Sequence, residues 1–353
     1  MAAPSVSAAG LADWHDHLQS SPSNHSALAR LQTEFGPADT FHSDRTLILS
    51  HFVACLEAVI SQTTDAGFAW TVGRSATHAT GGKIGRAILG SKTLGSGLRR
   101  LCDFVPLLQD ASQLKIEVDD DWCNLNYKIL DPNLWPRQAE ALYSLGIYAS
   151  LVFSTAPEAW RDVEITIEVE RDEANAKLHS VVNANIVYGG ETNTIRFPAR
   201  LLNLPMNLAV PAETSLHAEL YRALAAKRNS IAMSDRVCEV IYGSVGEHAM
   251  SQDSIAHTLG VSGGTMRRKL AAEGTSNQQL LDNCRMRLAP SGERLRPASD
   301  RFGQDRSPQP ARAVPVLLRT APRARRSGLA EPHRLRHGGS VRRVEAYRTT
   351  ALA

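Results

Sequence analysis

The sequence predicts an α+β domain in the N-terminal part of the chain and an all-α helix-turn-helix domain after it. Its 353 residues are enough for two domains of about 150 residues each. Strand-like and helix-like hydrophobic patterns alternate up to about residue 210, whereas only short helical patterns follow from Ser234. Hydrophobic residues make up 43% of the chain, so both parts have enough apolar side chains for a packed core, and general disorder is excluded.

The composition divides the chain further. Residues 1–43 are rich in Ala, Ser, Pro and His and show no sustained period, so we expect a loosely ordered lead-in. Residues 44–210 form the mixed domain, 211–233 a connecting helix and 234–289 the helical domain. Residues 290–353 contain 14 Arg, no Lys and 5 acidic residues, a net charge of +9, whereas the preceding 289 residues carry −6.

Within the mixed domain, the apolar spacing from Leu47 to Ile60 predicts a helix. Alternating patterns predict four strands there, and longer helical patterns predict two more helices in this domain and one in the connecting segment; the first of the three begins with Pro136 and is mostly apolar. The strands are expected at 115–118, 123–130, 164–171 and 192–199, and the helices at 136–153, 173–187 and 214–228.

The helical domain contains the signals of a helix-turn-helix at about residues 252–273. Ser251 is placed to cap the first helix, and Gly260 is suited to the left-handed backbone that ends it. Ser262 then caps a second helix whose Met266 and Leu270 face inward one turn apart. A further helix is expected from about Asn277 to Ala289.

Arg267, Arg268 and Lys269 lie on the outer side of the second helix. Arg pairs with guanine edges in two-pronged fashion and Lys neutralises phosphates, so this side is a candidate DNA-reading surface. An ordinary α-hairpin is the alternative that the pattern alone allows. The full set of candidate DNA-binding residues is Ser251, Ser262, Gly264, Thr265, Arg267, Arg268 and Lys269.

The segment IAHTLGVSGGTMRRKLAAEGTSNQQLLDNCRMRLA resembles the first helix-turn-helix of AraC/XylS-type bacterial transcription regulators. Upstream, GKIGRAILGSKTLGSGLRRLCDFVPLL and RFPARLLNLPMNLAVPAETSLHAELYRAL resemble the effector domain of the subgroup with an arabinose-binding-like N-terminal half. The resemblance extends from about Ala27 to Ala289. The matching helix-turn-helix positions are Ile255-Ala256, Leu259-Gly260, Ser262, Arg268, Leu270, Glu273-Gly274-Thr275-Ser276, Leu280, Arg285 and Leu288-Ala289.

Two features depart from that family. Gly263-Gly264 stands where these regulators often have a large or basic residue, which leaves Arg267 and Arg268 as the main candidates for base reading. The family's second helix-turn-helix has no counterpart from Pro290 onward, where seven prolines interrupt any helical pattern. This tail is either a basic arm that binds the DNA backbone or the product of out-of-frame translation of a G+C-rich gene, and we favour the second explanation.

The resemblance implies a DNA-binding transcription regulator that responds to a small-molecule effector, with activation of a catabolic operon as the default. Double-stranded promoter DNA, the effector, a second copy of the chain and, for an activator, RNA polymerase are the implied partners; no cofactor is expected. The effector-binding residues remain open. The alternatives are a ligand-binding or enzymatic α+β protein whose helical part is only structural, and a truncated, inactive regulator.

Other motifs favour neither an enzyme nor a membrane protein. No G-x-S-x-G turn and no phosphate loop ending in G-K-[ST] is found, so we expect no catalytic activity. His15-Asp16-His17 is a weak metal candidate without further ligands at suitable spacing. The five cysteines show no C-x-x-C spacing, and no apolar run is long enough to cross a bilayer, which predicts a soluble cytoplasmic protein.

Overall fold

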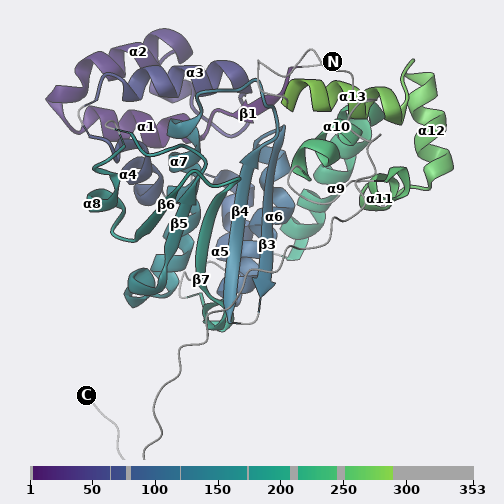
Figure 1. The fold of residues 1–353 in the computed structure, drawn as a ribbon. Coiled ribbons are helices and arrows are strands. Elements are labelled where there is room, and N and C mark those ends of the chain that lie inside the picture. Colours follow the sequence, from purple (N-terminus) through teal and green to yellow (C-terminus); the bar gives the residue numbers. More distant parts are fainter. Residues whose placement is uncertain are drawn as a thin grey trace, which may run out of the picture. The chain divides into compact units, whose positions relative to one another are not determined.

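A five-stranded sheet with the strand order β3-β4-β7-β5-β6 forms the framework of the N-terminal domain (Figure 1). The computed structural model describes residues 3–63, 65–76, 81–119, 121–172, 175–206, 214–244 and 251–288. Only β5 and β6 pair in parallel; the other neighbours are antiparallel. The strands are β3 (Ser112–Asp119), β4 (Trp122–Ile129), β5 (Glu164–Ile167), β6 (Asn185–Tyr188) and β7 (Asn193–Pro198).

Strand β4 shows why one face of this sheet is covered. Its side chains alternate between buried and partly exposed, and the buried ones are Cys123, Leu125, Tyr127 and Ile129. Helices α6 (Leu94–Leu108) and α7 (Gln138–Thr155) contact the sheet, and α7 is buried along most of its length. The predicted hairpin of two strands and the predicted apolar helix are therefore confirmed.

Helices α4 (Phe68–Ser75) and α7 approach each other closely because a glycine lies on each side of the contact. A Cβ atom on Gly73 would lie 2.1 Å from the carbonyl oxygen of Tyr143. A Cβ atom on Gly146 would lie 2.6 Å from the carbonyl oxygen of Trp70. Since both distances are shorter than any real contact, larger residues at these positions would push the two helices apart.

The remaining elements of the N-terminal domain surround this framework. They include a short strand pair, β1 with β2, and helix α9, whose Leu216 and Leu220 belong to the same hydrophobic core. The elements are β1 (Ser5–Ser7), α1 (Gly10–Gln19), α2 (His25–Phe35), β2 (Thr46–Ile48), α3 (Leu49–Ile60), α5 (Gly82–Leu89), α8 (Leu178–Val182) and α9 (Thr214–Ser230), with 3-10 turns at Pro22–Asn24, Ala38–Thr40, Pro157–Asp162 and Ala199–Asn203.

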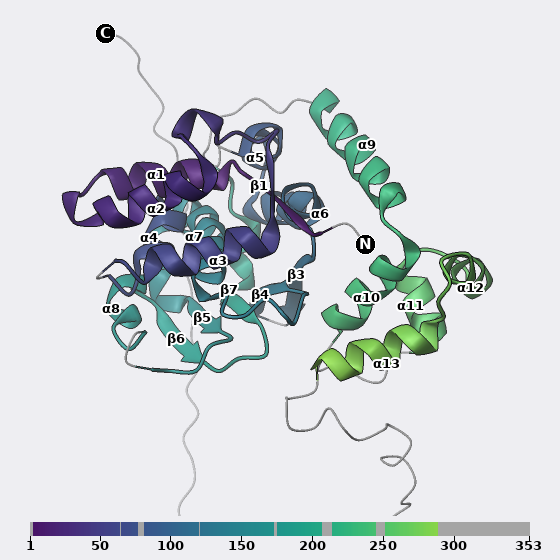
Figure 2. The same ribbon diagram turned by 90° about the horizontal axis from the view of Figure 1, so that it is seen from above.

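The expectation of a loosely ordered lead-in over residues 1–43 is wrong. Helix α2 packs against both α1 and α3 (Figures 1 and 2), and α1 also contacts α4. Leu11, Trp14 and Leu18 lie on one face of α1 and are completely buried. The small and polar residues between these apolar positions made the composition look irregular, although the spacing is helical.

A second correction concerns residues 173–187, which were expected to form one helix. Residues 173 and 174 lie outside the described residues, and only Leu178–Val182 is helical. Asn183 has φ +53, a left-handed conformation that ends α8, and the chain then enters β6. The strand expected at 164–171 is also shorter, since β5 ends at Ile167.

Four helices in the C-terminal part of the described chain form a second hydrophobic cluster, to which Leu130 after β4 also belongs. They are α10 (Met233–Gly243), α11 (Gln252–Thr258), α12 (Gly263–Ala272) and α13 (Asn277–Leu288). The most buried members of this cluster are Val237, Ile255, Met266, Leu270 and Cys284. The structure thus has the predicted fold class, a mixed α and β domain followed by a helical one. None of the described helices is both long and apolar enough to span a bilayer.

The burial of α2 gives a direct test of the corrected N-terminus. We predict that Leu31→Ala, which removes a fully buried side chain, lowers the free energy of unfolding by about 2–5 kcal/mol. Urea denaturation measures this value. Arg30→Ala, at an exposed position on the same helix, should change it by less than about 0.5 kcal/mol. Equal stability of the two variants would mean that α2 does not pack as described.

Candidate functional site

Two Schellman motifs set the geometry of helices α11 and α12. Gly260 has φ +66, and its amide donates to the carbonyl of His257 while the amide of Val261 donates to that of Ala256. The same pair of bonds recurs after α12, where Gly274 has φ +73. Because glycine adopts this left-handed backbone without a steric penalty, both helices end sharply. The structure therefore confirms the turn predicted at Gly260.

The side chains of Ser251 and Ser262 cap the two helices. Oγ of Ser251 accepts a hydrogen bond from the amide of Ser254, and Oγ of Ser262 accepts one from the amide of Thr265, each at 3.1 Å. Ser262 also donates to Oγ1 of Thr265 at 2.9 Å. Both predicted N-caps are confirmed, and α12 begins at Gly263 with Gly264 exposed in its first turn.

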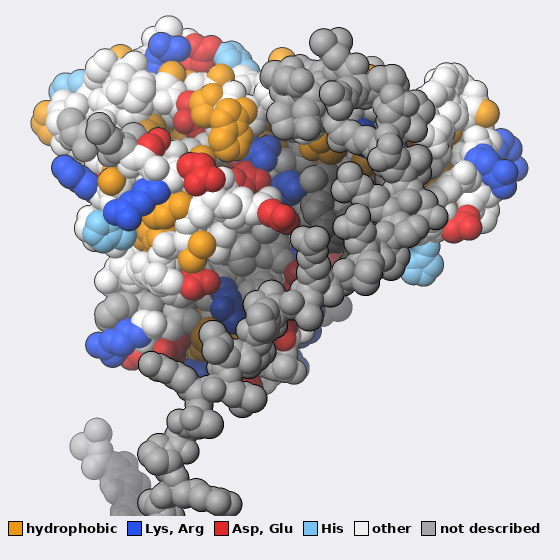
Figure 3. All heavy atoms as spheres, in the orientation of Figure 1, with side chains coloured by type: hydrophobic (Ala, Val, Ile, Leu, Met, Phe, Trp, Pro, Cys, Tyr) orange, Lys and Arg blue, Asp and Glu red, His pale blue; other side chains and the backbone are white. Residues whose placement is uncertain are grey.

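The outer face of α12 is basic and exposed. Arg267, Arg268 and Lys269 are all exposed, whereas Met266 and Leu270 on the opposite side are buried. Lys and Arg side chains gather over this helix at the right edge of Figure 3. No ion pair among the described residues occupies either arginine. The three basic side chains that sequence analysis singled out are thus exposed to solvent on α12.

Glu273 has a structural role that sequence analysis did not identify. Its carboxylate accepts hydrogen bonds from the backbone amides of Met233 and Ser234, both at 2.8 Å. Partial burial opposes ionisation of Glu273, but these two hydrogen bonds outweigh it and lower its pKa. The end of α12 is thereby fixed to the start of α10, since these amides belong to the first turn of that helix, where free amides need partners.

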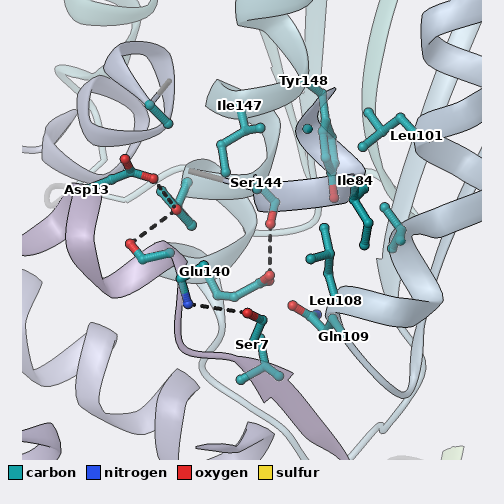
Figure 4. A pocket seen from close by; sticks show the side chains of 18 of the residues that line it. Ser7, Asp13, Ile84, Leu101, Leu108, Gln109, Glu140, Ser144, Ile147 and Tyr148 are labelled. Atoms are coloured by element: carbon teal, nitrogen blue, oxygen red, sulfur yellow. Dashed lines mark hydrogen bonds between the residues drawn. The ribbon is translucent and has the colours of Figure 1, made fainter. Parts of the chain in front are cut away.

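A pocket with a volume of about 140 Å³ lies in the N-terminal domain. Residues from β1, α1, α5, α6 and α7 line it, and they come from widely separated parts of the sequence (Figure 4). Ile84, Leu101, Leu108 and Ile147 form much of its apolar wall. The sequence left the effector-binding residues open; this pocket supplies candidates for them.

Glu140 is the most deeply buried polar residue of the pocket, with 1% of its surface exposed. Its Oε1 accepts hydrogen bonds from the hydroxyl of Tyr127 at 2.5 Å and from Ser144 at 2.9 Å, the latter drawn in Figure 4. Its Oε2 has no hydrogen-bond partner among the described residues. Burial raises the pKa of Glu140, although the hydrogen bonds from Tyr127 and Ser144 lower it. The sequence signal that could have indicated this site is the single carboxylate in the otherwise uncharged segment 138–153.

Asp13 is the second acidic residue of the pocket. Its Oδ2 accepts a hydrogen bond from the hydroxyl of Tyr143 at 3.0 Å. Burial raises the pKa of Asp13 to about 6, the hydrogen bond from Tyr143 lowers it, and the nearby charge of Asp16 raises it further. Both acidic side chains of the pocket are therefore in surroundings that disfavour their negative charge.

The metal candidate at His15-Asp16-His17 gains no further ligands. Nδ1 of His15 lies 3.4 Å from Oδ1 of Asp16, and its Nε2 lies 3.2 Å from Nε2 of Gln32. Within the described ranges, no three His, Cys, Asp or Glu side chains are grouped so that they could hold a metal ion. All five cysteines are free thiols.

Comparison with known proteins agrees with this arrangement. The family model described as the arabinose-binding domain of AraC transcription regulators, N-terminal, matches residues 25–206. The chain therefore belongs to this family, the AraC-type transcription regulators that carry such a domain.

Two individual proteins are similar to parts of the chain. The ornithine utilization regulator of Pseudomonas aeruginosa is 24% identical over 213 residues, which cover 59% of this chain and 61% of that protein. The match thus spans less than two thirds of the relative's length. The transcriptional regulator CdpR from Pseudomonas aeruginosa matches with 17% identity and a TM-score of 0.37, over 66% of this chain and 76% of that one, too low to relate the two folds in detail.

The raised pKa of Asp13 predicts a pH-dependent change in stability. A folded-state pKa of about 6, against an ordinary 3.8, means that the folded protein holds this proton more tightly than the unfolded chain does. Ionisation of Asp13 therefore costs stability as the pH rises from about 4 to 6. We expect Asp13→Asn to raise the free energy of unfolding by about 2–3 kcal/mol at pH 7 and by little at pH 4.

Thermal or urea unfolding of both proteins at several pH values measures this difference. A gain at pH 7 that vanishes at pH 4 is the expected result. If Asp13→Asn were less stable than the original chain at every pH, the negative charge of Asp13 would be favourable in the fold and the assignment would be wrong.

Proposed function

We propose that the chain is an effector-responsive regulator that binds promoter DNA through α12. The observation that carries this proposal is the exposed row Arg267, Arg268 and Lys269 on a helix whose start is capped by Ser262 and whose opposite face is buried. A capped second helix with free basic side chains has the features that a major-groove recognition helix needs. Ser251, Gly264 and Thr265 complete the proposed DNA-contacting set at the starts of α11 and α12.

The pocket supports the effector part of the proposal. It is enclosed largely by apolar side chains with a few buried polar groups, which is typical of small-molecule sites. In the regulator that we propose, a bound effector shifts the population between two arrangements of the chain, which requires that it bind one of them better. An enzymatic role has less support, since the matching family and both similar proteins are described as transcription regulators.

A polar network leads from the pocket to α9. Nζ of Lys227 on α9 pairs with Oδ1 of Asp110 at 2.7 Å. Oδ2 of the same aspartate accepts hydrogen bonds from the amide and the hydroxyl of Ser5 on β1, at 2.8 and 2.6 Å. The chain neighbours of these residues, Val6 and Gln109, line the pocket. We propose that a ligand that displaces β1 or Gln109 changes the position of α9 and hence of the helices that follow it.

Several finer points are part of the same proposal. The name of the Pseudomonas aeruginosa relative refers to ornithine utilization, which favours a catabolic operon as the target, and we propose that the chain activates it. As an activator in the cytoplasm, the chain would form a homodimer and contact RNA polymerase.

The residues after Leu288 lie outside those that the structure describes, so an arginine-rich arm and an out-of-frame tail both remain open for residues 290–353.

Arginine substitutions test the DNA-binding part of the proposal. Replacing Arg267 or Arg268 with alanine should weaken binding to the preferred site by about 1–3 kcal/mol and relax base preference there. Selection of binding sites from random DNA, followed by titration of the selected site, measures both effects. Arg30→Ala, an exposed arginine on α2, is the matched control and should bind as the original chain does. If both arginine variants selected the same consensus as the original chain, α12 would not be the reading helix.

Salt dependence tests the proposal for the tail. One helix-turn-helix docks in one major-groove segment and makes few phosphate contacts, so this chain should bind promoter DNA weakly, with an affinity that falls steeply as salt rises. Repair of the reading frame after the Leu288 codon, if the frame is shifted, should recover a second helix-turn-helix and much tighter binding. Nanomolar, salt-tolerant and site-specific binding by the present chain would instead identify residues 290–353 as a functional arm.

A further inference from the structure

The charges that line the pocket have one sign. Among the described lining residues, Asp13 and Glu140 are the only charged side chains, and no Lys, Arg or His lines the pocket beside them. The positive charge of Arg137 acts on Glu140, but its guanidinium already forms two hydrogen bonds with Glu168, at 2.9 and 3.0 Å. A negatively charged ligand would therefore meet two acidic groups, with no basic side chain among the described lining residues to compensate them.

The hydrogen-bonding groups of the pocket also disfavour a negatively charged ligand and favour one that donates a hydrogen bond. Two of the hydroxyls that line it donate within the protein, Tyr143 to Asp13 and Ser144 to Glu140. Among the described, fully buried polar atoms of the pocket, Oε2 of Glu140 has no hydrogen-bond partner, and this acceptor belongs to a side chain that is 1% exposed. A buried carboxylate oxygen without a donor is costly, so a ligand that supplies a donor and a positive charge would offset this cost.

The size and the walls of the pocket restrict the rest of the ligand. A volume of about 140 Å³ is close to that of an engineered cavity of about 150 Å³ that holds benzene. The walls are mostly apolar, formed by Phe52, Ile84, Leu101, Val105, Leu108 and Ile147. A monosaccharide would place several hydroxyls against these side chains without partners, which disfavours a sugar.

We propose that the pocket binds a small protonated amine with an apolar body, whose ammonium group donates a hydrogen bond to Oε2 of Glu140 while its body packs against the apolar wall. Glu140 and Asp13 together supply the negative charge that balances the cation (Figure 4). This inference rests on the proposed function and deepens it, because it names the chemical class of the effector. Asp13 retains its hydrogen bond from Tyr143 in this arrangement.

A series of matched ligands tests the proposal on the full-length chain by isothermal titration calorimetry. Phenethylamine is the probe; 2-phenylethanol has nearly the same shape without the charge, 3-phenylpropionate has the opposite charge, and L-arabinose represents a sugar. We expect one phenethylamine to bind per chain, at least tenfold more tightly than 2-phenylethanol, with no binding of the other two. No binding of phenethylamine, equal binding of the alcohol, or tighter binding of 3-phenylpropionate or L-arabinose would overturn the proposal.

Substitution of Glu140 identifies the carboxylate responsible. Glu140→Gln keeps an oxygen that accepts from Tyr127 and Ser144 but removes the charge, so the preference for phenethylamine over 2-phenylethanol should fall at least tenfold. Glu57→Gln is the matched control: Glu57 is a partly buried carboxylate that accepts from the amide of Ala139 at 2.7 Å and does not line the pocket. It should keep the preference of the original chain, and a Glu140→Gln protein that also keeps it would contradict the proposal.

The ligand series on the original chain decides the matter even if Glu140→Gln does not fold. Its outcome is also separate from that of the DNA-binding experiments. Loss of binding by the Arg267 and Arg268 variants would support the regulator whether or not phenethylamine binds. Conversely, if the chain bound the amine but did not bind DNA, the pocket assignment would stand and the proposed function would be contradicted.

Discussion

The buried carboxylate of Glu140 is the constraint on which the N-terminal domain depends. It lies on α7, accepts a hydrogen bond from Tyr127 on β4 and another from Ser144 one turn along its own helix. Nε2 of Gln109, which follows α6, in turn donates to the hydroxyl of Tyr127 at 2.8 Å. One acidic side chain thus joins strand β4 and two covering helices, in a core where burial of a charge is unfavourable unless partners are arranged for it.

The same arrangement explains why a pocket lies beside this residue. Two hydrogen bonds satisfy Oε1 but leave Oε2 unpartnered, and the apolar side chains of α5, α6 and α7 do not fill the space next to it. The residue after Gln109 is Asp110, which pairs with Lys227 of α9. The group that lines the pocket and the group that holds α9 are therefore adjacent in the chain, and this adjacency is the basis of the coupling that we propose.

The helix-turn-helix was predictable from sequence because its signals are local. Ser251, Gly260 and Ser262 act within five residues of themselves, and the apolar spacing of Met266 and Leu270 follows directly from the helical period. Glu273 escaped prediction, since its partners on α10 are 39 and 40 residues away. The pocket was not predictable for the same reason: Ser7, Ile84 and Tyr148 meet only after the domain has folded.

The N-terminal helices show a different limit. The composition of residues 1–43 predicts a loosely ordered segment, because polar and small residues separate the apolar positions. Leu11, Trp14 and Leu18 are nevertheless buried on one face of a helix. In contrast, the composition alone predicts α7, because most of its positions are apolar. A helix that uses one narrow face is recognised by spacing rather than by composition.

The link between the pocket and the helix-turn-helix is the central claim, and the affinity of the chain for a selected DNA site, with and without saturating phenethylamine, tests it most directly. A coupling free energy of about 1–3 kcal/mol corresponds to a change of about 5- to 150-fold in that affinity, and DNA must change the affinity for the amine by the same factor. The account predicts such a reciprocal change, and predicts that Lys227→Met, which removes the ion pair with Asp110, reduces it. Binding of both ligands with no mutual effect would contradict the claim.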